Sequence, residues 1–302
     1  MTDLLVTGTL ALDDVRTPFG EVADALGGSA TFFAYAASFF TDVKLVAVVG
    51  HDFPKEHLEL LAGRGVDLAG VQVTDGATFR WTGEYGYDLN EAKTLDTRLG
   101  VLADFKPELP GHFRRCPFVF LANLDPVIQL DVLRSMERPR LAALDTMNFW
   151  IKGKPEALRV VLREVDALLV NDTEARMLAG EPNLVKAARV ILGWGPRVVV
   201  VKRGEYGALM VTPDRFFFVP AYPLESVFDP TGAGDTFAGG FMGVLAGGGA
   251  TDEAALRRAI VYGSVIASFT VEGFSLNRLK RLTRADIEAR YRAFREMMHV
   301  EP

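Results

Sequence analysis

The 302-residue sequence has one cysteine, four histidines, no low-complexity tract and no apolar stretch long enough to span a membrane. The single Cys116 excludes a disulfide within the chain and a cysteine-rich metal site, so we interpret it as a small core residue. The histidines lack the spacing of metal ligands. The sequence does not begin with the pattern of a signal peptide, which is a basic segment, an apolar run and a small-residue cleavage site. We therefore expect a cytoplasmic protein without membrane contact.

Net charge narrows the possible partners further. A formal charge of −6 argues against a general nucleic-acid-binding protein. A nucleotide ligand does not conflict with this charge, because a few local donors are enough to hold phosphates. With 49% apolar residues, the chain can bury the core of one large α/β domain or two smaller ones.

Short apolar runs alternate with longer helical patterns along most of the chain. This alternation predicts a doubly wound, mostly parallel α/β sheet flanked by helices, with its active site at the carboxyl ends of the strands. The predicted strands are Leu4–Leu10, Lys44–Val49, Phe118–Leu121, Leu141–Asp145, Ala167–Asn171 and Val198–Lys202. The predicted helices cover residues 29–40, 54–63, 127–136, 155–164, 173–179, 184–193, 253–269 and 284–298.

Residues 71–103 interrupt this alternation. They are rich in Thr, Val and aromatic residues between turn residues, which predicts two or three β-strands. Together with residues 13–26 they would form a small sheet inserted at the edge of the core. A purely structural surface meander is the alternative, although the several aromatic residues require a cover on one face.

Residues 229–240, DPTGAGDTFAGG, are the most informative segment. Gly232, Ala233 and Gly234 form a turn of small residues that leads into a helix, where unpaired N–H groups and the helix dipole favour a phosphate. Asp235 follows directly, where it could take a proton from an attacking alcohol. A turn needed only for close packing is the alternative. No Walker A sequence and no strand-linked GxGxxG occurs elsewhere, so P-loop and dinucleotide-binding proteins are not supported.

This segment closely resembles the C-terminal signature of the ribokinase-like (PfkB) carbohydrate and nucleoside kinases. The resemblance implies one ribokinase-like domain over residues 1–302, with residues 13–26 and 71–103 as a β-sheet lid through which a homodimer would form. It implies an ATP- and Mg²⁺-dependent kinase that phosphorylates a hydroxyl, expected to be primary, of a sugar or nucleoside. Asp235 would be the general base, and the turn from Gly232 to Gly234 the anion hole.

Two elements would then contact the nucleotide and its metal. Asn171 and Glu174 resemble the family's N-x-x-E element, which organises Mg²⁺ through water, although a capping box gives the same pattern. Lys202 and Gly204 end a strand where the family contacts nucleotide phosphates, with Lys202 in place of the usual Thr; a charged strand end is the alternative. By resemblance Ser264 would contact adenine, and Asp229 and Thr231, with the loop 269–275, would hold a monovalent cation such as K⁺.

The acceptor side shows two departures from the family pattern. Asp13 would accept hydrogen bonds from acceptor hydroxyls, and Gly27 and Gly28 would let the backbone approach the acceptor closely. Ala11 and Phe32, however, stand where sugar kinases of the family commonly carry Asn. Phe32 either faces an apolar part of the acceptor, such as a nucleobase, or belongs to the core. We therefore expect a nucleoside in preference to a free sugar.

Two other classes of function remain as alternatives. A non-catalytic ligand-binding or regulatory protein can share a kinase fold. The presence of Asp235, Gly232, Gly234, Asn171 and Glu174 argues against it. A dehydrogenase is less well supported, because its dinucleotide fingerprint is missing.

Overall fold

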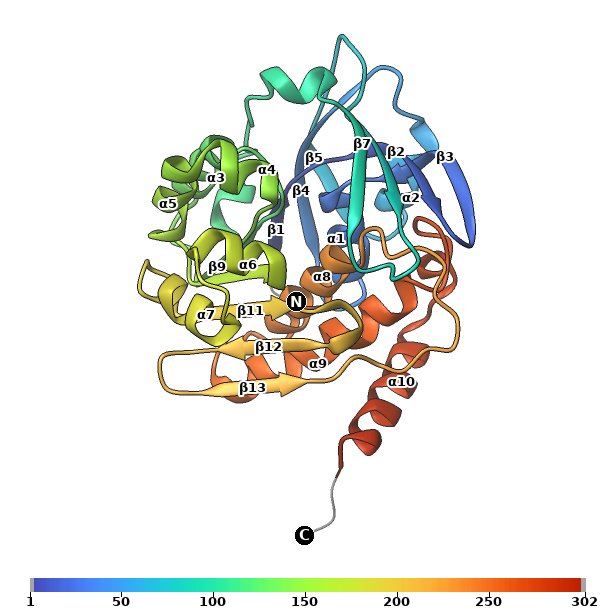
Figure 1. Cartoon of the computed structure of the whole chain (residues 1–302). Helices are drawn as coiled ribbons and strands as arrows, with labels where there is room; N and C mark the ends of the chain where they lie inside the picture. Colours follow the sequence, from blue (N-terminus) through green and yellow to red (C-terminus); the bar gives the residue numbers. More distant parts are fainter. Residues whose placement is uncertain (1–2, 300–302) are drawn as a thin grey trace.

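The computed structural model describes residues 3–299, which fold around a nine-stranded sheet (Figure 1). The strand order is β13-β12-β11-β10-β9-β8-β1-β4-β5; pairing is parallel from β11 to β5, and β12 and β13 add an antiparallel edge. The strands are β1 (Leu4–Thr7), β4 (Val43–Gly50), β5 (Val66–Thr74), β8 (Phe118–Leu121), β9 (Leu141–Asp145), β10 (Ala167–Asn171), β11 (Val198–Lys202), β12 (Ala208–Val211) and β13 (Phe216–Val219).

Helices cover both faces of this sheet, and successive residues of a strand serve opposite faces. Leu4 of β1 belongs to the core beneath one helical layer, while Leu5 belongs to the core beneath the other. The first layer contains α1 (Ser29–Ala37), α2 (Lys55–Ala62), α8 (Ala233–Gly248), α9 (Glu253–Thr270) and α10 (Arg284–Met297). The second contains α3 (Pro126–Arg134), α4 (Asn148–Gly153), α5 (Pro155–Leu162), α6 (Asp172–Ala179) and α7 (Leu184–Leu192).

The predicted fold class is confirmed. All six predicted core strands are present, although β1 ends at Thr7 and not at Leu10. All eight predicted helices form, with ends shifted by up to three residues. Three short elements, α4, β12 and β13, were not predicted, because four to six residues give too little periodicity to identify them. β5 was not predicted as a core strand either, and its residues from 71 onward were assigned to the small sheet. Within residues 3–299 no helix has both the length and the apolar character to cross a membrane.

A second, four-stranded sheet lies beside the core with the order β3-β2-β6-β7 (Figure 1). β2 pairs parallel with β6, and the other two pairs are antiparallel. The expected range 71–103 extends beyond this sheet at both ends, because residues 71–74 belong to β5 and residues 100–104 form a 3₁₀ turn. The four strands are β2 (Ala11–Thr17), β3 (Gly20–Gly27), β6 (Arg80–Tyr85) and β7 (Ala92–Arg98).

Phe33 provides a test of the core under α1. Its ring is fully buried and stacks on Phe120 of β8, with 4.3 Å between ring centroids. We expect Phe33→Ala to lower the free energy of unfolding by about 3–5 kcal/mol, because the sheet cannot close the cavity left behind. Urea unfolding would measure this loss. Phe218→Ala on β13, where the ring is 52% exposed, should cost less than about 1 kcal/mol; similar losses for both variants would contradict the packing described here.

Candidate functional site

Three neighbouring strands of the large sheet each end in a polar residue. Asp145 ends β9, Asn171 ends β10 and Lys202 ends β11. Asn171 lies opposite Lys202 in the register of the β10–β11 pair. Because the carboxyl ends of parallel strands meet at one edge of a sheet, these side chains share the place where α/β sheets bind ligands.

The N-terminus of α8 faces this edge. Gly232 precedes the helix with φ of 75°, a left-handed conformation, and a Cβ at this position would lie 2.3 Å from the ring of Phe32. The turn therefore requires glycine both for its backbone conformation and for space. Its tightness brings the first N–H groups of α8, which lack partners within the helix, to the strand ends. Phe237 and Phe241, four residues apart on α8, are both buried, so this face of the helix packs into the core.

Asp235 stands in the first turn of α8. Burial, followed by the negative charge of Asp145, raises the pKa of the Asp235 carboxyl to about 7, while Lys202 opposes the shift. A carboxyl with this pKa is a carboxylate in about half of the molecules at neutral pH. The group can therefore both accept and release a proton near pH 7, as an acid–base catalyst must.

An ion pair between Asp145 and Lys202 lies directly beside this turn. The ammonium nitrogen of Lys202 is 3.1 Å from Oδ2 of Asp145 and 3.1 Å from where a Cβ of Gly234 would stand. Oδ1 of Asp145 accepts the N–H of Thr146 at 2.6 Å, and the Asp145 side chain is only 6% exposed. Sequence reasoning missed Asp145, although a carboxylate that ends the buried strand LAALD was an available signal.

Asn171 and Glu174 form the capping box that the sequence left as an alternative. The N–H of Asn171 donates to Oε2 of Glu174 at 2.8 Å, and the N–H of Glu174 donates to Oδ1 of Asn171 at 2.7 Å. Burial, followed by the charge of Asp145, raises the pKa of Glu174 to about 7. The pair therefore begins α6 and also places a buried carboxyl group near Lys202 and Asp235.

Asp13 lies on β2, across from the α8 turn. Its Oδ2 would be 1.8 Å from a Cβ at Gly27, so the carboxyl group sits directly against that glycine. Its Oδ1 is buried and has no hydrogen-bond partner among the described residues. Burial raises the pKa of Asp13 to about 8, although the N–H of Gly28 lowers it in part.

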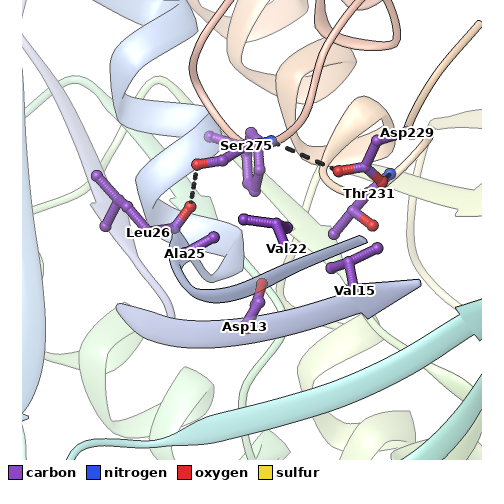
Figure 2. Close-up of a pocket in the computed structure, with 9 residues that line it drawn as sticks. Asp13, Val15, Val22, Ala25, Leu26, Asp229, Thr231 and Ser275 are labelled. Carbon is purple, nitrogen blue, oxygen red and sulfur yellow. Dashed lines mark hydrogen bonds between the residues drawn. The ribbon is translucent and has the colours of Figure 1, made fainter. Parts of the chain in front are cut away.

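A small cavity lies between Asp13, the loop that precedes α8 and the loop that follows α9 (Figure 2). Its volume is about 10 Å³, which is room for about one water molecule. Figure 2 shows Asp13 at the opposite side of this cavity from Asp229 and Thr231. The lining residues are Asp13, Val15, Val22, Ala25, Leu26, Phe32, Asp229, Thr231 and Ser275.

Hydrogen bonds connect the small sheet to the loop before α8. The Thr17 hydroxyl of β2 donates to the carbonyl of Phe228 at 2.9 Å, and the Thr231 hydroxyl contacts the hydroxyl of Tyr85 on β6 at 3.3 Å. Asp229 accepts the N–H of Thr231 at 2.9 Å. Burial raises the pKa of Tyr85, and the charges of Asp229, Asp13 and Asp235 raise it further. Sequence reasoning assigned no role to Tyr85, because its place depends on how the small sheet packs.

The remaining candidate residues are distributed as follows. The Phe32 ring is 2% exposed and covers Gly232, so in this conformation it belongs to the core as well as to the cavity wall. Gly204 begins a 3₁₀ turn. A Cβ on Gly204 would lie 2.5 Å from Oδ1 of Asn90, which belongs to the connection between β6 and β7. Ser264 is buried on α9, the helix that packs against α8. Cys116 is buried as expected, and burial raises the pKa of its thiol to about 11.

No inner-sphere metal centre is evident in the part of the chain that the structure describes. Among residues 3–299, no group of three or more His, Cys, Asp or Glu side chains is arranged to hold a metal ion. A magnesium ion held by nucleotide phosphates needs fewer protein ligands, because it keeps several waters.

The sequence matches the pfkB family carbohydrate kinase profile over residues 13–278. It is similar to a cytidine kinase of Thermococcus kodakarensis, with 32% identity over 80% of this chain and 88% of that protein. It is also similar to an ATP-dependent ribose-1-phosphate kinase of Halopiger xanaduensis, with 29% identity over 87% of each chain.

Comparison with solved structures supports the same fold. A ribokinase II-like protein of Escherichia coli, solved with ATP and Mg²⁺, superposes with a TM-score of 0.79. The alignment covers 97% of this chain and 100% of the other at 18% identity. At this identity the likeness concerns the fold alone.

Gly232 offers a test of the α8 turn, and Gly180 serves as its control. Both have a left-handed backbone, but a Cβ at Gly180 would meet nothing within 4 Å. Gly180→Ala should therefore cost about 1 kcal/mol in free energy of unfolding, from backbone strain alone. Gly232→Ala should cost about 1–3 kcal/mol more, because Phe32 must also move. Urea unfolding of both variants would measure the difference, and equal losses would show that Phe32 does not constrain the turn.

Proposed function

Because this chain belongs to the pfkB family of carbohydrate kinases, we propose that it transfers the γ-phosphate of ATP to a hydroxyl group of a nucleoside, with Asp235 as general base. Its relatives are kinases, so the chain is a phosphotransferase that acts on an alcohol group of a sugar or nucleoside. The observation that best supports the finer proposal is the position of Asp235, half-buried in the first turn of α8 with a pKa of about 7.

Asp235 would take the proton of the acceptor hydroxyl as its oxygen attacks phosphorus. A base with a pKa near neutrality combines a useful deprotonated fraction with sufficient basicity. The N–H groups of the turn from Gly232 to Gly234 would stabilise the charge on the transferring phosphoryl group, since the helix dipole favours an anion there. In this structure the N–H of Ala233 donates to the carbonyl of Pro230 at 3.1 Å, so Gly232 and Gly234 would be the main donors. Phosphoryl transfer depends mainly on such positioning and charge stabilisation, and both are built into this turn.

Kinases of this family use ATP with Mg²⁺. Oε2 of Glu174 is engaged by the N–H of Asn171, which leaves Oε1 for a metal-bound water. This donor set fits an outer-sphere magnesium site. When bound, Mg²⁺ neutralises phosphate charge. Lys202 and Gly204 would border the phosphates, and Ser264 the adenine.

A monovalent cation near Asp229 and Thr231 is a further part of the proposal. Asp229 is 1% exposed and has its carboxylate oxygens near the N–H groups of Thr231 and Ser275, at 2.9 and 3.5 Å. Burial raises the pKa of Asp229, so a cation such as K⁺ there would stabilise its charged form.

The lining of the acceptor cavity favours an uncharged acceptor. It contains Asp13 and Asp229 but no Lys or Arg. The phosphate of a sugar phosphate would therefore find no Lys or Arg side chain in the cavity lining to bind it. The free Oδ1 of Asp13 can accept a hydroxyl of the acceptor, which a nucleoside offers on its ribose. These points, together with the similarity to a cytidine kinase, support a nucleoside acceptor.

The small sheet would act as a lid over this cavity. A volume of about 10 Å³ cannot hold a nucleoside, so the sheet must move outward before the acceptor enters. The contacts of Thr17 and Tyr85 with the loop before α8 would hold it in the closed position and exclude water during transfer. Leu95 and Tyr87 are exposed on or near this sheet, which supports a homodimer formed through the lid.

The general base is tested by Asp235→Asn. We expect turnover to fall by about 10²–10⁴-fold, because asparagine cannot accept the proton. Binding of Mg-ATP, measured by calorimetry, should remain largely intact. The matched control is Asp214→Asn in the exposed β12–β13 connection, which should leave turnover unchanged. Near wild-type turnover by the Asp235 variant would reject the assignment.

The acceptor class is tested by ADP release from Mg-ATP with cytidine, uridine, inosine, ribose and ribose 1-phosphate. We expect kcat/KM for at least one nucleoside to exceed that for ribose and for ribose 1-phosphate by about tenfold or more. The two sugars lack the nucleobase and therefore lose its contacts in the transition state. If turnover is fastest with ribose 1-phosphate, the argument from the absence of Lys and Arg in the cavity lining is wrong. Asp13→Ala should raise KM for the preferred nucleoside and leave the affinity for ATP unchanged.

A further inference from the structure

The ion pair between Asp145 and Lys202 is not explained by proton abstraction at Asp235. Removing two charges from water is costly, and a buried pair is weak evidence for a stabilising role. The surroundings are also unbalanced in charge, because the carboxyl groups of Asp145, Glu174 and Asp235 all act on Lys202. Burial lowers the pKa of the Lys202 ammonium, but these carboxyl groups outweigh burial and keep it raised. The lysine therefore stays charged across the neutral range.

The position of the Lys202 ammonium indicates which part of a bound ligand it would contact. Its nitrogen is 3.1 Å from the Cβ position of Gly234, the second residue of α8, so it stands beside the turn that would hold the transferring phosphoryl group. An ammonium has three N–H donors. Asp145 is its hydrogen-bond partner among the residues that the structure describes, which leaves two donors for another acceptor.

Asp145 itself is held in place from three directions. Its Oδ1 accepts the N–H of Thr146 at 2.6 Å, and its carbonyl accepts Nε2 of the buried Gln129 at 3.0 Å. Its backbone also ends β9 inside the parallel sheet. A carboxylate fixed in this way restricts the flexible side chain of Lys202 to one position.

We propose that Lys202 contacts the γ-phosphate of ATP and that Asp145 is the positioning residue that holds the ammonium beside the α8 turn. The inference rests on the proposed function, since it assumes that ATP binds at this turn. Lysine suits the task as a compact point charge for phosphate. It would add a positive charge where the phosphoryl group leaves ADP, so the nucleotide that still carries its γ-phosphate would gain most.

Binding measurements separate this role from a structural one without depending on turnover. Calorimetry in the presence of Mg²⁺ would compare ADP with a non-hydrolysable β,γ-methylene ATP analogue. For Lys202→Met we expect the ATP analogue to bind about tenfold more weakly, which is the loss of one charge-assisted hydrogen bond. ADP affinity should change by less than about threefold. The control Arg203→Met, whose guanidinium lies over Tyr206 and Phe218, should change neither affinity.

Asp145 is tested in the same assay. Asp145→Asn should weaken the ATP analogue less than Lys202→Met does, because the ammonium remains but is no longer held. The double variant should match Lys202→Met alone, since Asp145 acts through the lysine. It also removes one charge of each sign, which leaves the net charge of the site unchanged and provides a folded comparison if a single variant fails to fold. Equal losses for ADP and the ATP analogue, or additive losses in the double variant, would overturn the proposal.

The pH dependence of kcat/KM supplies a second readout. Asp235 must be deprotonated to act, so activity falls as the pH drops through its pKa of about 7. The charged and titratable groups that act on this carboxyl are Asp145, Lys202, Glu174, Asp13 and Tyr85. Removing the charge of Asp145 should move the acidic limb to lower pH, and removing that of Lys202 should move it to higher pH.

Limb shifts of opposite direction would show that both charges act on Asp235, and shifts in the same direction would contradict that placement. The contact with the γ-phosphate itself is tested by the difference between the ADP and ATP-analogue affinities. Failure of the proposed function has a different signature. It would appear as full turnover by Asp235→Asn, whatever the nucleotide affinities of the Lys202 and Asp145 variants.

Discussion

The burial of three carboxyl groups around one ammonium is the constraint on which this site depends. Asp145, Glu174 and Asp235 come from β9, α6 and α8, and each has its pKa raised first by burial. Lys202 of β11 opposes that shift in all three. Without the lysine, the carboxyl groups would be more fully protonated at neutral pH, and the base proposed at the α8 turn would be lost.

The fold explains how four separate segments supply these groups. β9, β10 and β11 are adjacent parallel strands, so their last residues lie at the same edge of the sheet. Asn171 stands opposite Lys202, while Asp145 pairs with Leu169, two residues earlier on β10. The α8 turn then brings Asp235 and Gly234 onto the same edge, where a Cβ at position 234 would crowd the ammonium at 3.1 Å. The shape of the turn and the charge of the strand ends are therefore one arrangement, and a change in either alters the other.

The sequence predicted the large sheet well, because a strand that is buried on both faces of a parallel sheet is apolar along its whole length. It also located the α8 turn and Asp235 from a single continuous segment. Asp145 and Tyr85 were missed because their importance comes from neighbours distant in the chain, Lys202 at 3.1 Å and Thr231 at 3.3 Å. Phe32 shows the same limit: its place over Gly232 follows from the packing of α1 on α8, which no local pattern records.

The site divides into two halves of different character, with Asp235 between them. On the proposed phosphate side, the α8 N-terminus and Lys202 would attract anions. On the proposed acceptor side, Asp13 and Asp229 lie among apolar walls, and the lining has no Lys or Arg to attract an anion. Such a division directs the triphosphate to one side and an uncharged alcohol to the other, so that the base meets the acceptor hydroxyl and not a second phosphate. The contact of Tyr85 with Thr231 links the small sheet to this boundary, because Thr231 borders the cavity and immediately precedes the turn. In the proposed mechanism, closure of the small sheet over the acceptor would therefore be coupled to the shape of the phosphate site through one loop.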